Sequence, residues 1–316
     1  MHPIFIFGFG RSGTTWLANI FDSSPDTRYS HEPDKLLRCS DLPAIITLED
    51  TSPYHARLRA YANSLIKTRL LPTVNNKATF AKSYRSQPAN LLRQGYFMLA
   101  NLAAKATGDH LHPSVPDFCN TNSAVPVIKS VSSLGRLPAL AHALPEAKFI
   151  FLLRHPAAIH ASLTRGVKLG KMAPFELYDD QLDLDYAQRK FIGPIERSRM
   201  SAAEKVAWSW AIFNDFILKR CEELNNIQVL KYEDLCQAPL GTARSLFKFA
   251  NLPWQQQSEQ YLQESLSLEA NEHGYHDVRR NPLETMDKWR IELASNEIEL
   301  MESIAADSLP GKLYGF

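Results

Sequence analysis

The chain has 316 residues, of which 45% are hydrophobic, so it can build the core of one large domain or two small ones, and a disordered chain is excluded. Its 35 basic and 34 acidic side chains leave a formal charge of +1, which excludes the broad basic surface of a dedicated nucleic-acid binder. Any anion site must therefore be local, and the oligomeric state stays open.

The start of the chain and the cysteines indicate the compartment. Met1-His2-Pro3 leads directly into Ile4-Phe5-Ile6-Phe7, without the basic stretch and longer apolar segment of a secretory signal. No apolar run approaches the roughly 20 residues that cross a bilayer. The 4 cysteines stand far apart, unlike paired metal ligands, and are typical of ordinary thiols in a reducing compartment. We expect a cytoplasmic protein with no membrane span and no bound metal.

Short apolar runs that end in turn or charged residues predict buried parallel strands. These runs are Ile4 to Phe7, Val125 to Ile128, Lys148 to Leu153, and Ile227 to Tyr232. Helical stretches follow two of them: Thr14 to Phe21 after the first, and Pro156 to Leu163 after the third, with proline at a favoured first helical position. This alternation predicts a three-layer α/β/α fold with a central, mostly parallel sheet, similar to the P-loop nucleoside triphosphatases.

Two long segments do not fit the alternating pattern. Residues Pro33 to Thr121 lack strand character and are helical in places such as Leu91 to Ala106, while Arg165 to Met200 is charged and irregular. We expect both to be insertions that form an acceptor pocket or a lid. After them, Ser201-Ala-Ala-Glu204 has capping-box spacing and predicts a helix to about Glu223. With no repeat or low-complexity linker, residues 1–316 are expected to form a single domain.

A phosphate-binding loop is predicted where the first strand meets the first helix, at Gly8-Phe9-Gly10-Arg11-Ser12-Gly13-Thr14-Thr15-Trp16. Glycines at both ends of the loop allow a tight turn, so that backbone amides and the helix amino terminus converge on one phosphate. The spacing matches a nucleotide P-loop, but Thr14 stands where the lysine that reaches the β and γ phosphates belongs. The positive charge lies at Arg11 instead, which suits a shorter donor than a triphosphate. A glycine-rich turn that merely starts a helix is the alternative.

This run resembles the 5′-phosphosulfate loop of the sulfotransferase superfamily, in the arginine-bearing form of the carbohydrate and tyrosylprotein enzymes. The resemblance implies that the donor is 3′-phosphoadenosine 5′-phosphosulfate (PAPS), that the product is 3′-phosphoadenosine 5′-phosphate (PAP), and that no metal is required. It assigns donor binding to six loop residues: Arg11, Ser12, Gly13, Thr14, Thr15 and Trp16.

A second match follows the third predicted strand. In Phe151-Leu152-Leu153-Arg154-His155-Pro156 an arginine ends the strand, and Ser162 comes eight residues later on the next helix. A guanidinium and a hydroxyl so spaced could address one phosphate from the crevice beside the sheet. This arrangement is similar to the superfamily's 3′-phosphate site, which assigns that role to Arg154 and Ser162. A surface arginine and a helix-face serine would be the alternative.

Sulfuryl transfer needs a base for the acceptor's proton and cations for the charge on the departing phosphate. The segment around Glu32 resembles the place where the arginine-loop enzymes carry a catalytic glutamate, so Glu32 is the candidate base. The neighbouring His31 is the rival base. By resemblance, Lys129 approaches the transferring group and acts there with Arg11. The phenol-type enzymes have a histidine two residues beyond such a lysine, but this chain has Val131, which increases the weight on Glu32.

The carboxy-terminal part adds further donor candidates. Lys231-Tyr232-Glu233-Asp234-Leu235 resembles a family segment whose tyrosine lies near the cofactor. Arg280 and Lys288 fall in a region that looks like the family's closing loop over the nucleotide, although a basic cluster on a solvated loop is an equal alternative. The two insertions match nothing in the family.

The sequence thus predicts a sulfotransferase that acts on a hydroxyl-bearing acceptor: a carbohydrate, a peptide tyrosine or a small-molecule alcohol. A P-loop small-molecule kinase is the alternative enzyme, weakened by the missing loop lysine. A catalytically inactive nucleotide-binding module is the third hypothesis, against which the set of Arg11, Glu32, Lys129 and Arg154 argues.

Overall fold

A central sheet of five parallel strands organises the chain, in the order β2-β3-β1-β4-β5. The computed structural model describes residues 2–37, 39–74, 79–108, 110, 112–119, 123–267 and 286–316. The strands are β1 (Ile4–Gly8), β2 (Thr27–His31), β3 (Val125–Ser130), β4 (Lys148–Leu153) and β5 (Ile227–Lys231). Because all five run in one direction, their carboxyl ends meet at one edge of the sheet, where α/β proteins bind ligands.

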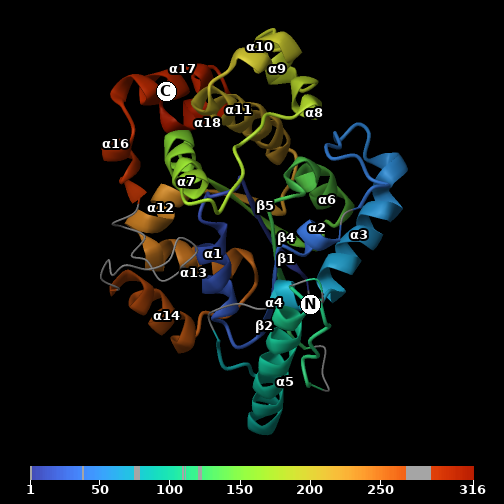
Figure 1. Cartoon of the computed structure of the whole chain (residues 1–316). Helices are drawn as coiled ribbons and strands as arrows, with labels where there is room; N and C mark the ends of the chain where they lie inside the picture. Colours follow the sequence, from blue (N-terminus) through green and yellow to red (C-terminus); the bar gives the residue numbers. More distant parts are fainter. Residues whose placement is uncertain are drawn as a thin grey trace.

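Alternate residues of β1 face two different helical layers. Ile4 and Ile6 pack with α1 (Thr14–Asp22), α12 (Tyr232–Gln237), α13 (Pro239–Phe249) and α14 (Gln256–Ser267). Phe5 and Phe7 face the opposite layer, which includes α3 (His55–Lys67), α6 (Leu137–Ala143), α7 (Pro156–Lys168), α11 (Ala202–Cys221) and α17 (Ser295–Ala305). The period of two in a strand thus builds the expected α/β/α arrangement, seen in Figure 1.

Shorter helices and one long helix complete the described chain. The short ones are α2 (Pro33–Leu36), α4 (Leu71–Val74), α8 (Asp179–Leu182), α9 (Asp185–Arg189), α10 (Pro194–Arg199), α16 (Trp289–Glu292) and α18 (Leu309–Tyr314), with 3₁₀ turns at Ser52–Tyr54 and Leu134–Arg136. The long helix α5 (Gln87–Ala106) projects away from the sheet (Figure 1). Within the described ranges, no helix is both long enough and apolar enough to cross a membrane.

The structure corrects two of the predicted strand assignments. The segment before Glu32, which was not among the predicted strands, is the edge strand β2, which pairs with β3 from Thr27↔Val125 to His31↔Lys129. Its sequence Thr-Arg-Tyr-Ser-His lacks the continuous apolar run of the central strands, because an edge strand is not covered on all sides. The last strand ends at Lys231, and Tyr232 begins α12.

Parts of both predicted insertions belong to the core. In the first, Leu58 and Leu65 of α3 are fully buried against the sheet layer. In the second, Tyr186 of α9 is buried in the same cluster and donates a hydrogen bond to the carbonyl of Ile304, at 2.8 Å. Helix α5, in contrast, carries large apolar side chains that stay exposed. The part of the first segment that departs most from the compact body is therefore α5.

Helix α11 begins as its sequence predicts. The Ser201 hydroxyl accepts a hydrogen bond from the Glu204 amide at 3.3 Å, and the Glu204 carboxylate accepts one from the Ser201 amide at 2.8 Å. This reciprocal capping box satisfies two amides that the first helical turn leaves without intrahelical partners.

Candidate active site

The loop between β1 and α1 has a backbone that few sequences allow. Arg11 and Gly13 both adopt left-handed conformations, with φ of 73° and 94°. A Cβ atom at Gly13 would lie 2.4 Å from Cε2 of Tyr232, so only glycine fits both the conformation and the space. The Ser12 amide donates to the Phe9 carbonyl at 3.1 Å and closes the turn.

The same loop presents polar groups at the start of a helix. The Ser12 hydroxyl is fully buried and has no hydrogen-bond partner among the described residues. Thr14 and Thr15 open α1, whose first amides point out of the helix toward the loop. Backbone amides, a buried hydroxyl and the positive end of a nine-residue helix form a cradle for an anion, and these residues fit the phosphate of the implied donor.

Hydrogen bonds join the two predicted phosphate motifs. The Arg11 Nε donates to the Ser162 hydroxyl on α7 at 3.0 Å. The Arg154 Nη1, at the end of β4, donates to the Arg11 carbonyl at 3.1 Å. Residues more than 140 positions apart in the chain therefore meet at one edge of the sheet.

The aromatic side chains of Tyr232 and Trp16 pack beneath Arg154 and the phosphate loop, on the side of the core. The Arg154 guanidinium lies over the ring of Tyr232 at 4.4 Å, and that ring also contacts Gly13. Trp16 is buried edge-on against Tyr232 and donates its indole N–H to the Ser265 hydroxyl at 3.2 Å. In this structure Tyr232 and Trp16 position the loop and Arg154 from within the core.

Glu32 and Lys129 form an ion pair beside the loop. Glu32 directly follows β2 and Lys129 lies near the end of β3, so neighbouring strands bring the two side chains together. The Lys129 side chain is 4% exposed and that of Glu32 is 20% exposed. Glu32 has a left-handed backbone with φ of 44°, and its amide donates to the Lys129 carbonyl at 2.9 Å. Strain at this residue is typical of functional sites.

Electrostatics keep Glu32 in its basic form. Burial acts to raise the pKa of Glu32, but the charge and hydrogen bond of Lys129 outweigh it, so the pKa lies below its usual value. Burial lowers the pKa of Lys129, opposed by Glu32, and Arg11 is close enough to lower it further. Arg11, Lys129 and Glu32 thus share one electrostatic environment.

His31 lies closer to Glu32 than adjacent strand residues usually do. Its Nε2 is 3.9 Å from Oε1 of Glu32, and its Nδ1 is hydrogen-bonded to the Tyr29 hydroxyl at 2.8 Å. Burial and the charge of Lys129 lower the pKa of His31 to about 4, so it is neutral at physiological pH. This low pKa does not separate His31 from Glu32 as a base, because the pKa of Glu32 is lowered as well.

Asp34 is a site residue that the sequence reasoning missed. Its Oδ2 accepts hydrogen bonds from the Ser130 hydroxyl at 2.5 Å and from the Ser132 amide at 2.8 Å. These bonds tie the segment after Glu32 to the end of β3. Burial raises the pKa of Asp34, against the hydrogen bond from Ser130. Two serines that flank Val131, just after Lys129, were the available signal in the sequence.

The predicted carboxy-terminal donor residues are only partly described. Arg280 lies outside the described residues. Lys288 is exposed and precedes Trp289, which stacks on His155 at 4.2 Å between ring centroids. Since His155 follows Arg154, Lys288 is attached near the predicted 3′-phosphate site. In the described part of the chain, no group of three or more His, Cys, Asp or Glu side chains could hold a metal ion.

Comparisons with known proteins identify a family for the chain. The model of the Sulfotransferase family matches residues 3–256. Carbohydrate sulfotransferase 3 of Mus musculus is 24% identical over 178 residues, which are 54% of this chain and 34% of the relative. The Homo sapiens protein of that name is 24% identical over 88 residues, 28% of this chain and 18% of the relative. The chain thus spans about a third or less of these curated relatives.

Two solved structures align with nearly the whole chain. The sulfotransferase domain from the curacin biosynthetic pathway covers 98% of this chain and 99% of its own, with 16% identity and a TM-score of 0.47. A mouse sulfotransferase, SULT7A1, complexed with PAP covers 99% of this chain and 87% of its own, with 11% identity and a TM-score of 0.46.

Proposed function

We propose, from the premise that this chain belongs to the sulfotransferase family, that it transfers a sulfuryl group from PAPS to a hydroxyl group of an acceptor. The observation that carries the proposal is the hydrogen-bonded link from Arg154 through the Arg11 carbonyl, and from Arg11 to Ser162, around the phosphate loop. It puts two guanidinium groups and a helix amino terminus at one edge of the sheet, which suits a donor that carries separate phosphate groups.

The donor-binding roles follow from these positions. The loop from Arg11 to Thr15 would hold the 5′-phosphosulfate through backbone amides and the Ser12, Thr14 and Thr15 hydroxyls. Arg154 and Ser162 would select the 3′-phosphate. Bound PAPS supplies the sulfuryl group, and the residues around it supply position and charge. Lys288 and Arg280 are proposed as further contacts to the nucleotide.

In the transfer step, Glu32 is proposed as the general base. The acceptor oxygen forms a bond to sulfur while the bond between sulfur and the 5′-phosphate oxygen breaks, and the acceptor proton passes to the Glu32 carboxylate. PAP leaves with the electron pair of the broken bond. Arg11 and Lys129 stabilise the negative charge that develops on the departing phosphate and the sulfuryl oxygens.

A carbohydrate hydroxyl is the acceptor that the comparisons support best. The curated relatives of known name are carbohydrate sulfotransferases, and the phosphate loop of this chain has the arginine form. Peptide tyrosines and small-molecule alcohols use the same chemistry at the sulfur and are the alternatives to test.

Calorimetric binding of PAP, 5′-AMP and ATP, without added metal, tests the donor assignment. We expect PAP to bind more tightly than 5′-AMP, since a charged hydrogen bond contributes about 1.5–3 kcal/mol, and Arg154→Ala to weaken PAP about 10- to 100-fold. The effect on 5′-AMP should be smaller, and it arises from the lost hydrogen bond to the Arg11 carbonyl. The exposed Arg199→Ala is the matched control. A preference for ATP, or no effect of the 3′-phosphate, would favour a kinase and overturn the proposal.

A further inference from the structure

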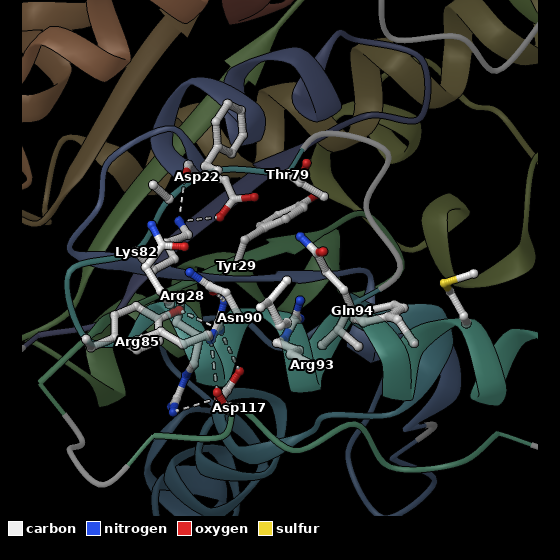
Figure 2. A pocket seen from close by; sticks show the side chains of 18 residues that line it. Asp22, Arg28, Tyr29, Thr79, Lys82, Arg85, Asn90, Arg93, Gln94 and Asp117 are labelled. Carbon is white, nitrogen blue, oxygen red and sulfur yellow. Dashed lines mark hydrogen bonds and ion pairs between the residues drawn. The ribbon is translucent and has the colours of Figure 1, made fainter.

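A cavity of about 620 Å³ lies outside the donor loop, between the edge strand β2 and helix α5. Its lining includes Arg28 and Tyr29 of β2, Arg85 from the preceding segment, and Arg93 on α5. In Figure 2, dashed lines join Arg28 and Arg85 to Asp117, and Arg93 lies on the neighbouring helix α5. None of these residues belongs to the motifs that the sequence analysis singled out.

Positive charge in the cavity wall exceeds negative charge. Asp117 is contacted by three guanidinium groups, at 3.4 Å from Arg28, 3.0 Å from Arg69 and 3.6 Å from Arg85. Arg93 adds a fourth cation to the same surroundings. One carboxylate cannot neutralise four guanidinium groups that are largely withdrawn from water.

The other polar side chains of the cavity do not supply the missing negative charge. Asp22 is already paired with the buried ammonium of Lys82, at 2.8 Å. Burial raises the pKa of Tyr84 to about 12, so its hydroxyl stays neutral. The excess of positive charge beside Asp117 therefore remains.

Arg93 is the cation with the fewest ties to the protein. It lies over the ring of Phe97 at 4.6 Å, but no described residue accepts a hydrogen bond from it. Its Nε is nevertheless buried. Burial and the charge of Arg85 both lower the pKa of Arg93, as expected for a cation that lacks its own counterion. An arginine so placed keeps its Nη donors available to an anion in the cavity.

The cavity is connected to the catalytic edge through β2. Tyr29 lines the cavity, and its hydroxyl is bonded to His31, which lies 3.9 Å from the Glu32 carboxylate. Glu32 lies four positions after Arg28 along nearly extended chain, about 13 Å at 3.3 Å per residue. Leu91 and Met98 add an apolar rim, and they are 68% and 70% exposed.

We propose that this cavity binds an oxyanion group, a carboxylate, sulfate or phosphate ester, carried by the acceptor at a distance from the hydroxyl that reacts. Arg93 is the main new contact, and Arg28 and Arg85 contribute charge from the wall. An acceptor that reaches both the cavity and Glu32 is elongated, and it carries negative charge. This assignment rests on the proposed function, of which it specifies the acceptor.

Binding of inorganic sulfate to the chain saturated with PAP tests the site itself, because PAP occupies the donor loop. We expect the wild type to bind sulfate, Arg93→Gln to bind it about 10-fold more weakly, and Arg93→Lys to retain part of the affinity. Lys105→Gln removes the same charge from the exposed end of α5 and serves as the matched control. Sulfate binding that is equal in wild type and Arg93→Gln would overturn the site, provided that thermal unfolding shows both proteins folded.

Transfer assays then identify the source of the anion. The assays compare an acceptor that the protein sulfates with its uncharged derivative, such as the methyl ester of a carboxylate. Arg93→Gln should raise the KM of the charged acceptor about 10-fold, and leave the KM of the uncharged derivative, kcat and the Kd of PAP unchanged. The assignment would be overturned if the acceptor proves to carry no oxyanion, or if Arg93→Gln changes the KM of both forms equally. Sulfate binding in the cavity would then be binding of a free anion. Failure of the proposed function would appear separately, as loss of PAP binding in the wild type.

Discussion

The proposed donor edge, where the phosphate loop meets Arg154 and Ser162 at the carboxyl ends of the strands, and the β2–α5 cavity both contain several arginines. The two sites hold these arginines in different ways. At the donor edge, Arg11 belongs to the phosphate loop, whose backbone amides and following helix α1 complete the site, and Arg154 follows the end of β4. Each arginine donates a hydrogen bond within the site. In the cavity, Asp117 is shared by Arg28 and Arg85 of the wall and by Arg69, which is not a lining residue, while Arg93 lies over the ring of Phe97. One site is fixed by the backbone, and the other is fixed by charge.

This difference has a consequence for specificity. A backbone cradle accepts one phosphate in one orientation, since its amides cannot move without loss of the loop. Arginine side chains around a shared carboxylate can adjust to carboxylate, sulfate or phosphate. We therefore expect the donor edge to select one nucleotide and the cavity to tolerate several oxyanions.

The largest effect is expected at Glu32. Glu32→Gln removes the base but keeps the size of the side chain, so turnover should fall at least about 100-fold while PAP binding survives. Single-turnover rates together with calorimetric Kd values measure both quantities. Unchanged turnover would exclude Glu32 as the base. The same substitution at the exposed Glu299 is a control for the loss of one negative charge.

Replacement of Gly13 tests whether the donor edge depends on its backbone. Gly13→Ala forces a Cβ into the ring of Tyr232 at a φ of 94°, so we expect at least 10-fold weaker PAP binding and a destabilisation of about 1–3 kcal/mol. Gly10→Ala is the control for stability, because its Cβ would meet no atom within 4 Å. Denaturant unfolding of both variants gives the comparison, and equal stabilities would refute the strained turn.

The pH dependence of turnover tests the Glu32–Lys129 pair. As the proposed base, Glu32 accepts a proton only when it is deprotonated, so we expect activity to be lost as pH falls through its pKa. Lys129→Met removes the charge and hydrogen bond that lower this pKa and leaves burial, which raises it, so the acid limb should move to higher pH. Lys35→Met removes an exposed, weaker contributor and should move the limb less. If the acid limb of Lys129→Met lay at the same pH as in the wild type, the limb would not report the pKa of Glu32.

The smallest effects concern the independence of the two sites. Arg154→Ala should change sulfate binding to the cavity by less than about twofold, and Arg93→Gln should leave PAP affinity within the same limit, since distant sites contribute additively. Titrations of both ligands into both variants measure this. A coupled loss would show that the two sites act as one.

Much of the donor edge could be predicted from the sequence, because its residues are close together in the chain or follow apolar strands. The loop from Gly8 to Trp16 carries its own turn and helix signals, and the strand before Arg154 is a continuous apolar run. The edge strand β2 was missed because Tyr29 is the one largely apolar side chain among its five residues, so it has neither an apolar run nor an alternating pattern. Without β2, the sequence could not predict the register that brings His31 opposite Lys129.

The sequence by itself determined the sheet's central strands, the phosphate loop and the identity of the ionisable groups, since these depend on local patterns of apolar residues and glycine. Only the tertiary structure decided that Glu32 pairs with Lys129, that Asp34 anchors the segment beside them, and that Arg28, Arg69 and Arg85 surround Asp117. Charges far apart in a chain have no local signature, because their interaction arises only when packing brings them together and removes the water between them.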